Sequence, residues 1–62
     1  MNSYSVYKVL VVESRQLLLV NDGVKFSLAV YDEHTGQTLV RLCEPTVDEF
    51  AHALTVLKGS SL

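Results

Sequence analysis

One cysteine and two histidines are the residues of this sequence that most often carry catalysis. Cys43 is the single thiol, and a nucleophilic cysteine needs a histidine or another cation beside it. Arg41 shares the expected strand face of Cys43, but neither histidine is placed near it along the chain. Free cysteine is among the residue types most often buried. We therefore expect Cys43 to be a structural residue.

The acidic residues do not converge on a site either. Asp48 precedes His52 by four residues on an expected helix, which resembles an oriented general base but more simply describes a solvated pair. Asp32-Glu33 and Asp48-Glu49 are adjacent pairs, whose side chains project in different directions. The thiol and the histidines lack the paired spacing of a zinc site, and no glycine-rich phosphate loop occurs. We expect no enzymatic activity, no cofactor and no metal.

The size and charge of the chain favour a small acidic protein that self-associates. It has 62 residues, a net charge of −2 and 48% hydrophobic residues. Such a chain buries only about 60% of its unfolded surface, and a single cysteine provides no internal disulfide. Its apolar runs are too short for a membrane span or a signal peptide. We expect one cytoplasmic domain over residues 1–62, with an ordered core of about 4–59.

Four strands are expected from the apolar pattern and its turn signals. Asn21-Asp22-Gly23 predicts one hairpin turn, and Glu33 to Gln37 predicts a second with a three-residue loop and Gly36 as a bulge. The expected strands are Tyr4–Glu13, Gln16–Asn21, Val24–Asp32 and Gln37–Cys43. The second hairpin sets four expected pairs: Val30 with Val40, Leu28 with Leu42, Tyr31 with Leu39, and Ala29 with Arg41.

A helix over Val47–Lys58 follows Pro45, which ends the last strand. Thr46 and Glu49 have the spacing of a capping box, and Lys58 with Gly59 supplies a basic last turn and a stop. The predicted apolar stripe is Val47, Phe50, Ala51, Leu54 and Leu57. We expect it to cover Phe26, Leu28, Val30, Val40 and Leu42, with Leu18 and Val20 as further neighbours. The fold class is α+β: a four-stranded antiparallel β-meander followed by one C-terminal amphipathic helix on one face.

The sheet face opposite the helix is the expected interface. It would show an apolar patch that a monomer does not normally leave exposed, and homodimerisation or a fold-over of the first strand would cover it. The candidate interface residues are Tyr7, Val9, Val11, Tyr31 and Leu39. We expect a non-enzymatic protein-interaction module that binds itself and an unidentified protein, which it regulates or inhibits, in the manner of an adaptor, an antitoxin or a phage-type inhibitor.

The alternative is a single-stranded nucleic-acid-binding protein that uses the same face. Lys25, Tyr31 and Arg41 combine cations with a stacking aromatic, which are the components of a single-strand platform. In topology alone, four strands followed by a helix is similar to small dimeric single-strand-binding transcription coactivators. The acidic composition favours the protein-binding hypothesis over this one.

Overall fold

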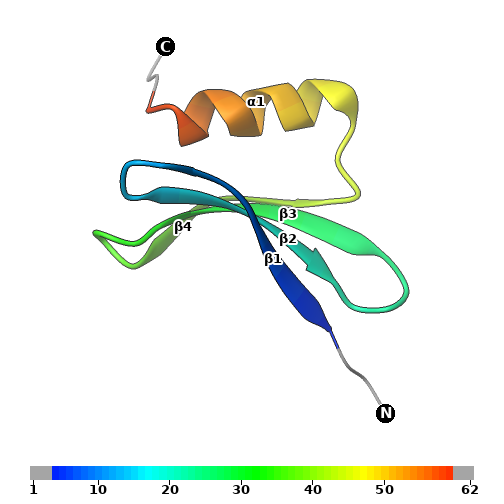
Figure 1. The fold of residues 1–62 in the computed structure, drawn as a ribbon. Coiled ribbons are helices and arrows are strands. Elements are labelled where there is room, and N and C mark those ends of the chain that lie inside the picture. Colours follow the sequence, from blue (N-terminus) through cyan, green and yellow to red (C-terminus); the bar gives the residue numbers. More distant parts are fainter. Residues whose placement is uncertain (1–3, 60–62) are drawn as a thin grey trace.

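Four antiparallel strands form one sheet, and one helix packs on one of its faces (Figure 1). The computed structural model describes residues 4–59, and the strands lie in the order β1-β2-β3-β4. The elements are β1 (Ser5–Val12), β2 (Arg15–Asn21), β3 (Phe26–Asp32), β4 (Gln37–Cys43) and α1 (Val47–Leu57). The expected α+β meander with a C-terminal helix is confirmed.

The turn between β2 and β3 lies where Asn21-Asp22-Gly23 predicted it, but it is longer than expected. The Asp22 carboxylate accepts hydrogen bonds from the amides of Val24 and Lys25, each at 2.9 Å, and holds both residues in the loop. Gly23 has a φ of 92°, which glycine adopts without strain. Strand β3 therefore begins at Phe26 instead of Val24.

The pairing of β2 with β3 decides which side chains of β2 face the helix. Strand β2 pairs with β3 as Leu17 with Val30, Leu18 with Ala29, Leu19 with Leu28 and Val20 with Ser27. Leu17 and Leu19 therefore share the face of the core. The expectation that Leu18 and Val20 contact the helix is wrong, because their partners Ala29 and Ser27 lie on the opposite face of β3 from Leu28 and Val30.

The hairpin between β3 and β4 keeps the predicted core pairs and changes the rest. The pairs of Val30 with Val40, Leu28 with Leu42 and Ala29 with Arg41 are confirmed. The loop has four residues instead of three, because Asp32 pairs with Gln37. A register shift next to Tyr31 compensates by leaving Leu39 without a partner, so Tyr31 lies opposite Thr38 and not opposite Leu39.

The helix begins with the predicted capping box. The Thr46 hydroxyl accepts from the Glu49 amide at 3.2 Å, and the Glu49 carboxylate accepts from the Thr46 amide at 2.8 Å. The predicted stripe is confirmed at Leu57, which is buried, and at Leu54, which packs against the core, but the second buried residue is Ala53 and not Ala51. The small side chain of Ala53 lets the backbone approach the sheet closely. The core consists of Leu17, Leu28, Val30, Ala53 and Leu57.

The helix therefore packs on the sheet mainly through its C-terminal half. Leu54 and Val56 are half-buried against the core, whereas Phe50 is 40% exposed and Val47 is 83% exposed. The helix contacts β2, β3 and β4. In Figure 1 the N-terminal part of β1 (blue) runs away from the helix. One side of the sheet thus remains uncovered near β1.

Candidate interaction surface

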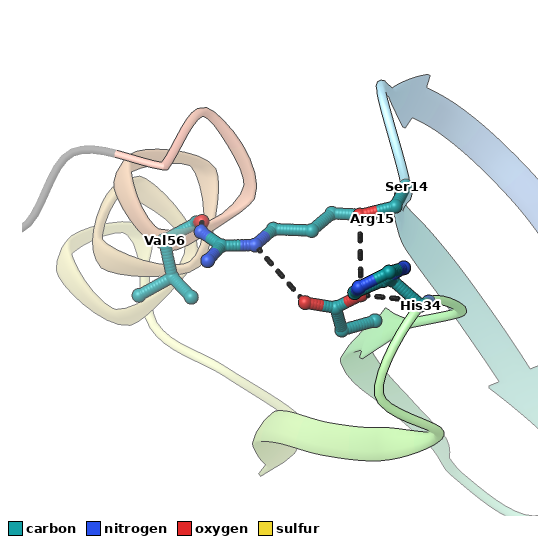
Figure 2. A network of polar contacts seen from close by, with 5 residues as sticks. Ser14, Arg15, His34 and Val56 are labelled. Atoms are coloured by element: carbon teal, nitrogen blue, oxygen red, sulfur yellow. Dashed lines mark hydrogen bonds and ion pairs between the residues drawn. The ribbon is translucent and has the colours of Figure 1, made fainter.

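A polar network fixes the C-terminal end of α1 to the β1–β2 turn, at Ser14, and to the β3–β4 turn, at His34 (Figure 2). Arg15 Nη1 donates to the Val56 carbonyl at 2.6 Å, and Arg15 Nε lies 3.7 Å from Asp32 Oδ2. Asp32 Oδ1 accepts from the Ser14 hydroxyl at 3.1 Å and from the His34 amide at 2.9 Å. Asp32 is only 7% exposed, so one buried carboxylate joins both turns to the helix through Arg15.

The surroundings of Asp32 favour its ionised form. Burial raises the pKa of the Asp32 carboxyl, but bonds from the His34 amide, the Ser14 hydroxyl and the Thr35 amide outweigh that effect, aided by the Arg15 charge. Their sum lowers the pKa below its ordinary value of 3.8. The ion pair and the hydrogen bonds fully account for the lowered pKa of Asp32. We therefore interpret the network as a structural tether that holds the end of the helix to the sheet.

The cation at the C-terminal end of α1 is Arg15 and not, as expected, Lys58. The last turn of α1 holds no basic residue, and Lys58 is the C-cap. The Val56 carbonyl accepts from Arg15 and also from the amide of Gly59, at 3.0 Å. The predicted glycine stop is confirmed, with a φ of 83° at Gly59. The cation at the negative end of the helix dipole therefore comes from β2.

An apolar groove of about 410 Å³ lies beneath the N-terminal half of α1, at the end opposite this tether. Strands β1, β2 and β3 and the segment that leads into the helix form its walls. The lining residues are Val9, Leu17, Leu19, Phe26, Leu28, Pro45, Thr46, Val47 and Phe50. Leu17 and Leu28 belong to the core, so the groove reaches from solvent to the centre of the protein.

The groove remains open because its two aromatic side chains are only partly covered. Phe26 is 42% exposed and Phe50 is 40% exposed, although both lie on the inner side of the fold. The expectation that the helix covers Phe26 and buries Phe50 is therefore wrong. Burial is complete at Ala53 and Leu57 in the C-terminal half of the helix and falls towards Phe50 and Val47 at its start.

The structure separates the five predicted interface residues. Tyr7 pairs with Leu19 and Val9 lines the groove, so both lie on the helix side of the sheet. Val11 and Tyr31 lie on the outer face, where Gln16 of β2 pairs with Val11 of β1 on one side and with Tyr31 of β3 on the other. Leu39 is the unpaired residue of the bulge on β4. The expected common face is wrong because a bulge at Val9 interrupts the alternation of β1.

The outer face carries a row of residues that ends in a cation at each edge of the sheet. Lys8 pairs with Leu18, Leu18 with Ala29, and Ala29 with Arg41. A shallow hollow of about 390 Å³ lies on this face. Its lining residues are Tyr4, Val20, Asp22, Lys25, Ser27, Ala29, Thr38 and Arg41.

The nucleic-acid candidates therefore share one face, although they do not form one cluster. Lys25 and Arg41 both line the hollow, and Tyr31 lies two residues beyond Ala29 on β3. Asp22 brings a carboxylate to the same hollow. Hydrogen bonds from the amides of Lys25 and Val24 lower the pKa of Asp22, so its negative charge offsets part of the positive charge.

The catalytic candidates are not assembled into a site. Cys43 is exposed on β4, where it pairs with Ser27 on the expected face. His34 contributes its backbone amide to Asp32, and His52 lies on the exposed side of α1. Within residues 4–59, no group of three histidine, cysteine, aspartate or glutamate side chains could hold a metal ion. No helix in this part of the chain is long and apolar enough to cross a membrane.

Comparisons with known proteins found no match for this chain. No family model matches it, and neither the curated proteins nor the solved structures contain a match. The groove was not found by sequence reasoning, although one signal pointed towards it. Val47 and Phe50 are three residues apart in the first turn of α1, directly after Pro45, and that spacing places both apolar side chains on one side of the helix start.

Proposed function

We propose that this chain is a small, non-enzymatic, cytosolic protein-interaction module that forms a homodimer and binds, and thereby regulates or inhibits, another protein. The observation that carries the proposal is the open groove beneath α1, with Phe26 and Phe50 exposed at its mouth. Partly exposed aromatics in an apolar pocket are typical of the centre of an interface. The groove is continuous with the apolar side chains of β1, which extends the surface beyond a single pocket.

Charge around the groove indicates the chemistry of the partner. Asp48 and Glu49 lie in the first turn of α1, beside Val47. The mouth of the groove is therefore apolar with an acidic rim. An apolar anchor flanked by lysine or arginine would complement it, because rim charges steer association and select among partners.

The test compares proteins retained from a lysate by the wild type and by two variants. Val47→Asp puts a charge at the groove mouth, yet it suits the first position of a helix and should not unfold the chain. Val24→Asp is the matched control, because Val24 is 90% exposed in the β2–β3 loop, outside the groove. Proteins bound through the groove should be lost with Val47→Asp and kept with Val24→Asp. Identical retained sets for the wild type and Val47→Asp would refute the proposal.

A second candidate, binding of single-stranded nucleic acid, is favoured by the row from Lys8 to Arg41. Of the five Lys and Arg residues, Lys8, Lys25 and Arg41 lie on the outer face or line its hollow. Tyr31 adds a half-buried aromatic ring beside them. This basic side coexists with the net charge of −2 because most of the carboxylates lie in turns and at the start of the helix.

A titration of a labelled single-stranded oligonucleotide at two salt concentrations tests this candidate. Binding should weaken with salt, and Tyr31→Ala should cost about 1 to 3 kcal/mol if bases stack on the ring. Arg41→Ala should also weaken binding. Lys58→Ala is the control, because it removes an exposed cation at the end of the helix. Binding that is unchanged in both Tyr31→Ala and Arg41→Ala would exclude this function.

A further inference from the structure

Strand β1 is an unpaired edge with unusually apolar side chains. Its residues Val6, Tyr7, Val9, Leu10 and Val11 are each between 44% and 55% exposed. The other edge, β4, is contacted by the helix, and its single exposed large hydrophobic residue is Leu39. Natural proteins normally protect an edge strand with charge or cover. Strand β1 has one charged residue, Lys8, and within residues 4–59 no further strand pairs with its outer edge.

The apolar area at this edge matches the needs of an interface. The five side chains of β1, with Phe26, Val47 and Phe50 at the adjoining groove, expose on the order of 700 Å². One partner contributes about 800 Å² to a standard interface, so the whole patch has the size of an interface, and pairing through β1 covers the part of it that β1 contributes. A monomer normally leaves a patch of this size exposed only when the patch has a function.

The bulge at Val9 makes β1 complementary to itself. It interrupts the alternation, so Val6 and Val11 both point to the outer face, while Tyr7 and Leu10 both point to the helix side. When β1 runs antiparallel to a second β1 over its full length, Val6 lies opposite Val11 of the second copy, and Tyr7 lies opposite Leu10. In this register both pairs lie on matching faces, and the central pairs of Lys8 with Val9 of the second copy fall at the bulge, where the regular ladder is interrupted.

We propose that two copies of this chain join through β1, in antiparallel register from Ser5 to Val12, to form one continuous eight-stranded sheet. This inference rests on the self-association proposed above and names its surface. The two helices lie on the same side of the joined sheet. Between them the Tyr7 and Leu10 side chains of both copies extend the two grooves into one apolar trough. A two-fold axis through the sheet relates the copies, which is the commonest symmetry of soluble oligomers.

Charge argues against the alternative dimer, in which the outer faces stack. The outer face carries Lys8 and Arg41, and its strand positions within residues 4–59 hold no carboxylate. Stacking two such faces would bring Lys8, Lys25 and Arg41 of both copies together with Asp22 as the one carboxylate that lines the hollow, which is costly when the cations are desolvated. In the edge-to-edge dimer Lys8 remains at the surface of the sheet.

Introducing opposite charges at two valine positions of β1 tests the register. Val11→Glu and Val6→Lys, made singly, each place a charge opposite a valine of the second copy. Each should raise the dimer dissociation constant about tenfold, because symmetry repeats the altered pair. The double variant places lysine opposite glutamate twice and should return the constant to within about threefold of the wild type. Positions 6 and 11 lie far apart along one strand, so recovery cannot arise within a single copy.

Light scattering after size exclusion, from 1 to 500 µM as a practical range of about three decades, gives the solution mass. Val24→Glu controls for added charge, circular dichroism checks folding, and Val6→Glu with Val11→Lys repeats the exchange in reverse. A wild type that stays at 6.9 kDa throughout would refute the dimer. A dimer that tolerates Val11→Glu would refute the β1 edge, and single losses without recovery in either double variant would refute the register. A monomer that still loses its partners with Val47→Asp would leave the proposed protein binding intact.

Discussion

At the scale of single residues, Asp32 has the most consequential surroundings in the fold. Its carboxylate is nearly buried and accepts from the Ser14 hydroxyl and the His34 amide, while Arg15 extends from it to the Val56 carbonyl. An aspartate at the end of a strand suggested only a turn residue from sequence. The contacts make it the point where two hairpin turns and the helix meet.

Acid should weaken the fold in part through Asp32. Its pKa is lowered in the folded chain, so folding favours loss of its proton, and the contribution is complete above about pH 5. This contribution disappears as the pH falls from 3.8 through the folded pKa. We expect Asp32→Asn to be less stable at pH 7 and to show a flatter decline between about pH 5 and pH 2 in urea unfolding. Glu44→Gln, at an exposed carboxylate, is the control, and an unchanged acid profile in Asp32→Asn would contradict the assignment.

Arg15→Met should separate the helix end from the sheet without removing the apolar stem. Loss of a charge-assisted hydrogen bond to the Val56 carbonyl is expected to cost about 1 to 3 kcal/mol in the free energy of unfolding. Arg41→Met removes an exposed guanidinium on β4 and should change stability by less than about 0.5 kcal/mol. Equal urea midpoints for the two variants would show that the Arg15 contact contributes nothing.

At the scale of elements, the helix is fixed at one end and open at the other. The Arg15 contact and the buried Ala53 and Leu57 hold its C-terminal half, while Phe50 remains at the groove. The spacing of apolar residues in the sequence correctly predicted an amphipathic helix. It could not decide how the helix is rotated and tilted on the sheet, because that depends on where small residues permit close approach.

The loss of stability on truncating a helix side chain should therefore depend on the position of that side chain along the helix. Leu57→Ala removes a fully buried side chain and should cost about 2 to 5 kcal/mol. Phe50→Ala should cost less, since 40% of Phe50 is already exposed, and Thr46→Ala should cost about 1 kcal/mol through the lost cap. Chemical denaturation of the three variants at one protein concentration gives the order. A Phe50→Ala variant less stable than Leu57→Ala would refute the placement of the helix.

At the scale of the whole molecule, the two faces of the sheet differ in chemistry. The helix side is apolar from the core to the groove, and the outer side carries Lys8 and Arg41 at its edges. A net charge of −2 conceals this separation. The protein-binding and nucleic-acid hypotheses therefore use different surfaces and can be tested independently.

Self-association should also show in thermal unfolding. If folding is coupled to dimer formation, the melting temperature should rise with protein concentration, by mass action. In the β1 dimer the Lys8 side chains of the two copies are near neighbours on the outer face, so added salt should screen them and tighten the dimer. Oligonucleotide binding should instead weaken with salt. A melting temperature that is independent of concentration from about 5 to 500 µM would exclude coupled dimerisation.

The local elements of this protein could be predicted from its sequence. The capping box at Thr46, the glycine stop at Gly59 and the core pairs of Val30 with Val40 and Leu28 with Leu42 are confirmed. Each depends on neighbouring residues, on steric limits of the backbone, or on matching apolar side chains across one hairpin. Such interactions act over short distances in the chain, so the order of residues states them directly.

Tertiary structure alone decided which residues meet across the fold. The bulges at Val9 and Leu39 each shifted a strand register by one residue, and each shift moves side chains to the opposite face. The groove and the Arg15 contact with Val56 then arose from packing between elements up to 41 residues apart. The sequence determines the elements because their causes are local, and packing determines the surface because it depends on how all of them fit together.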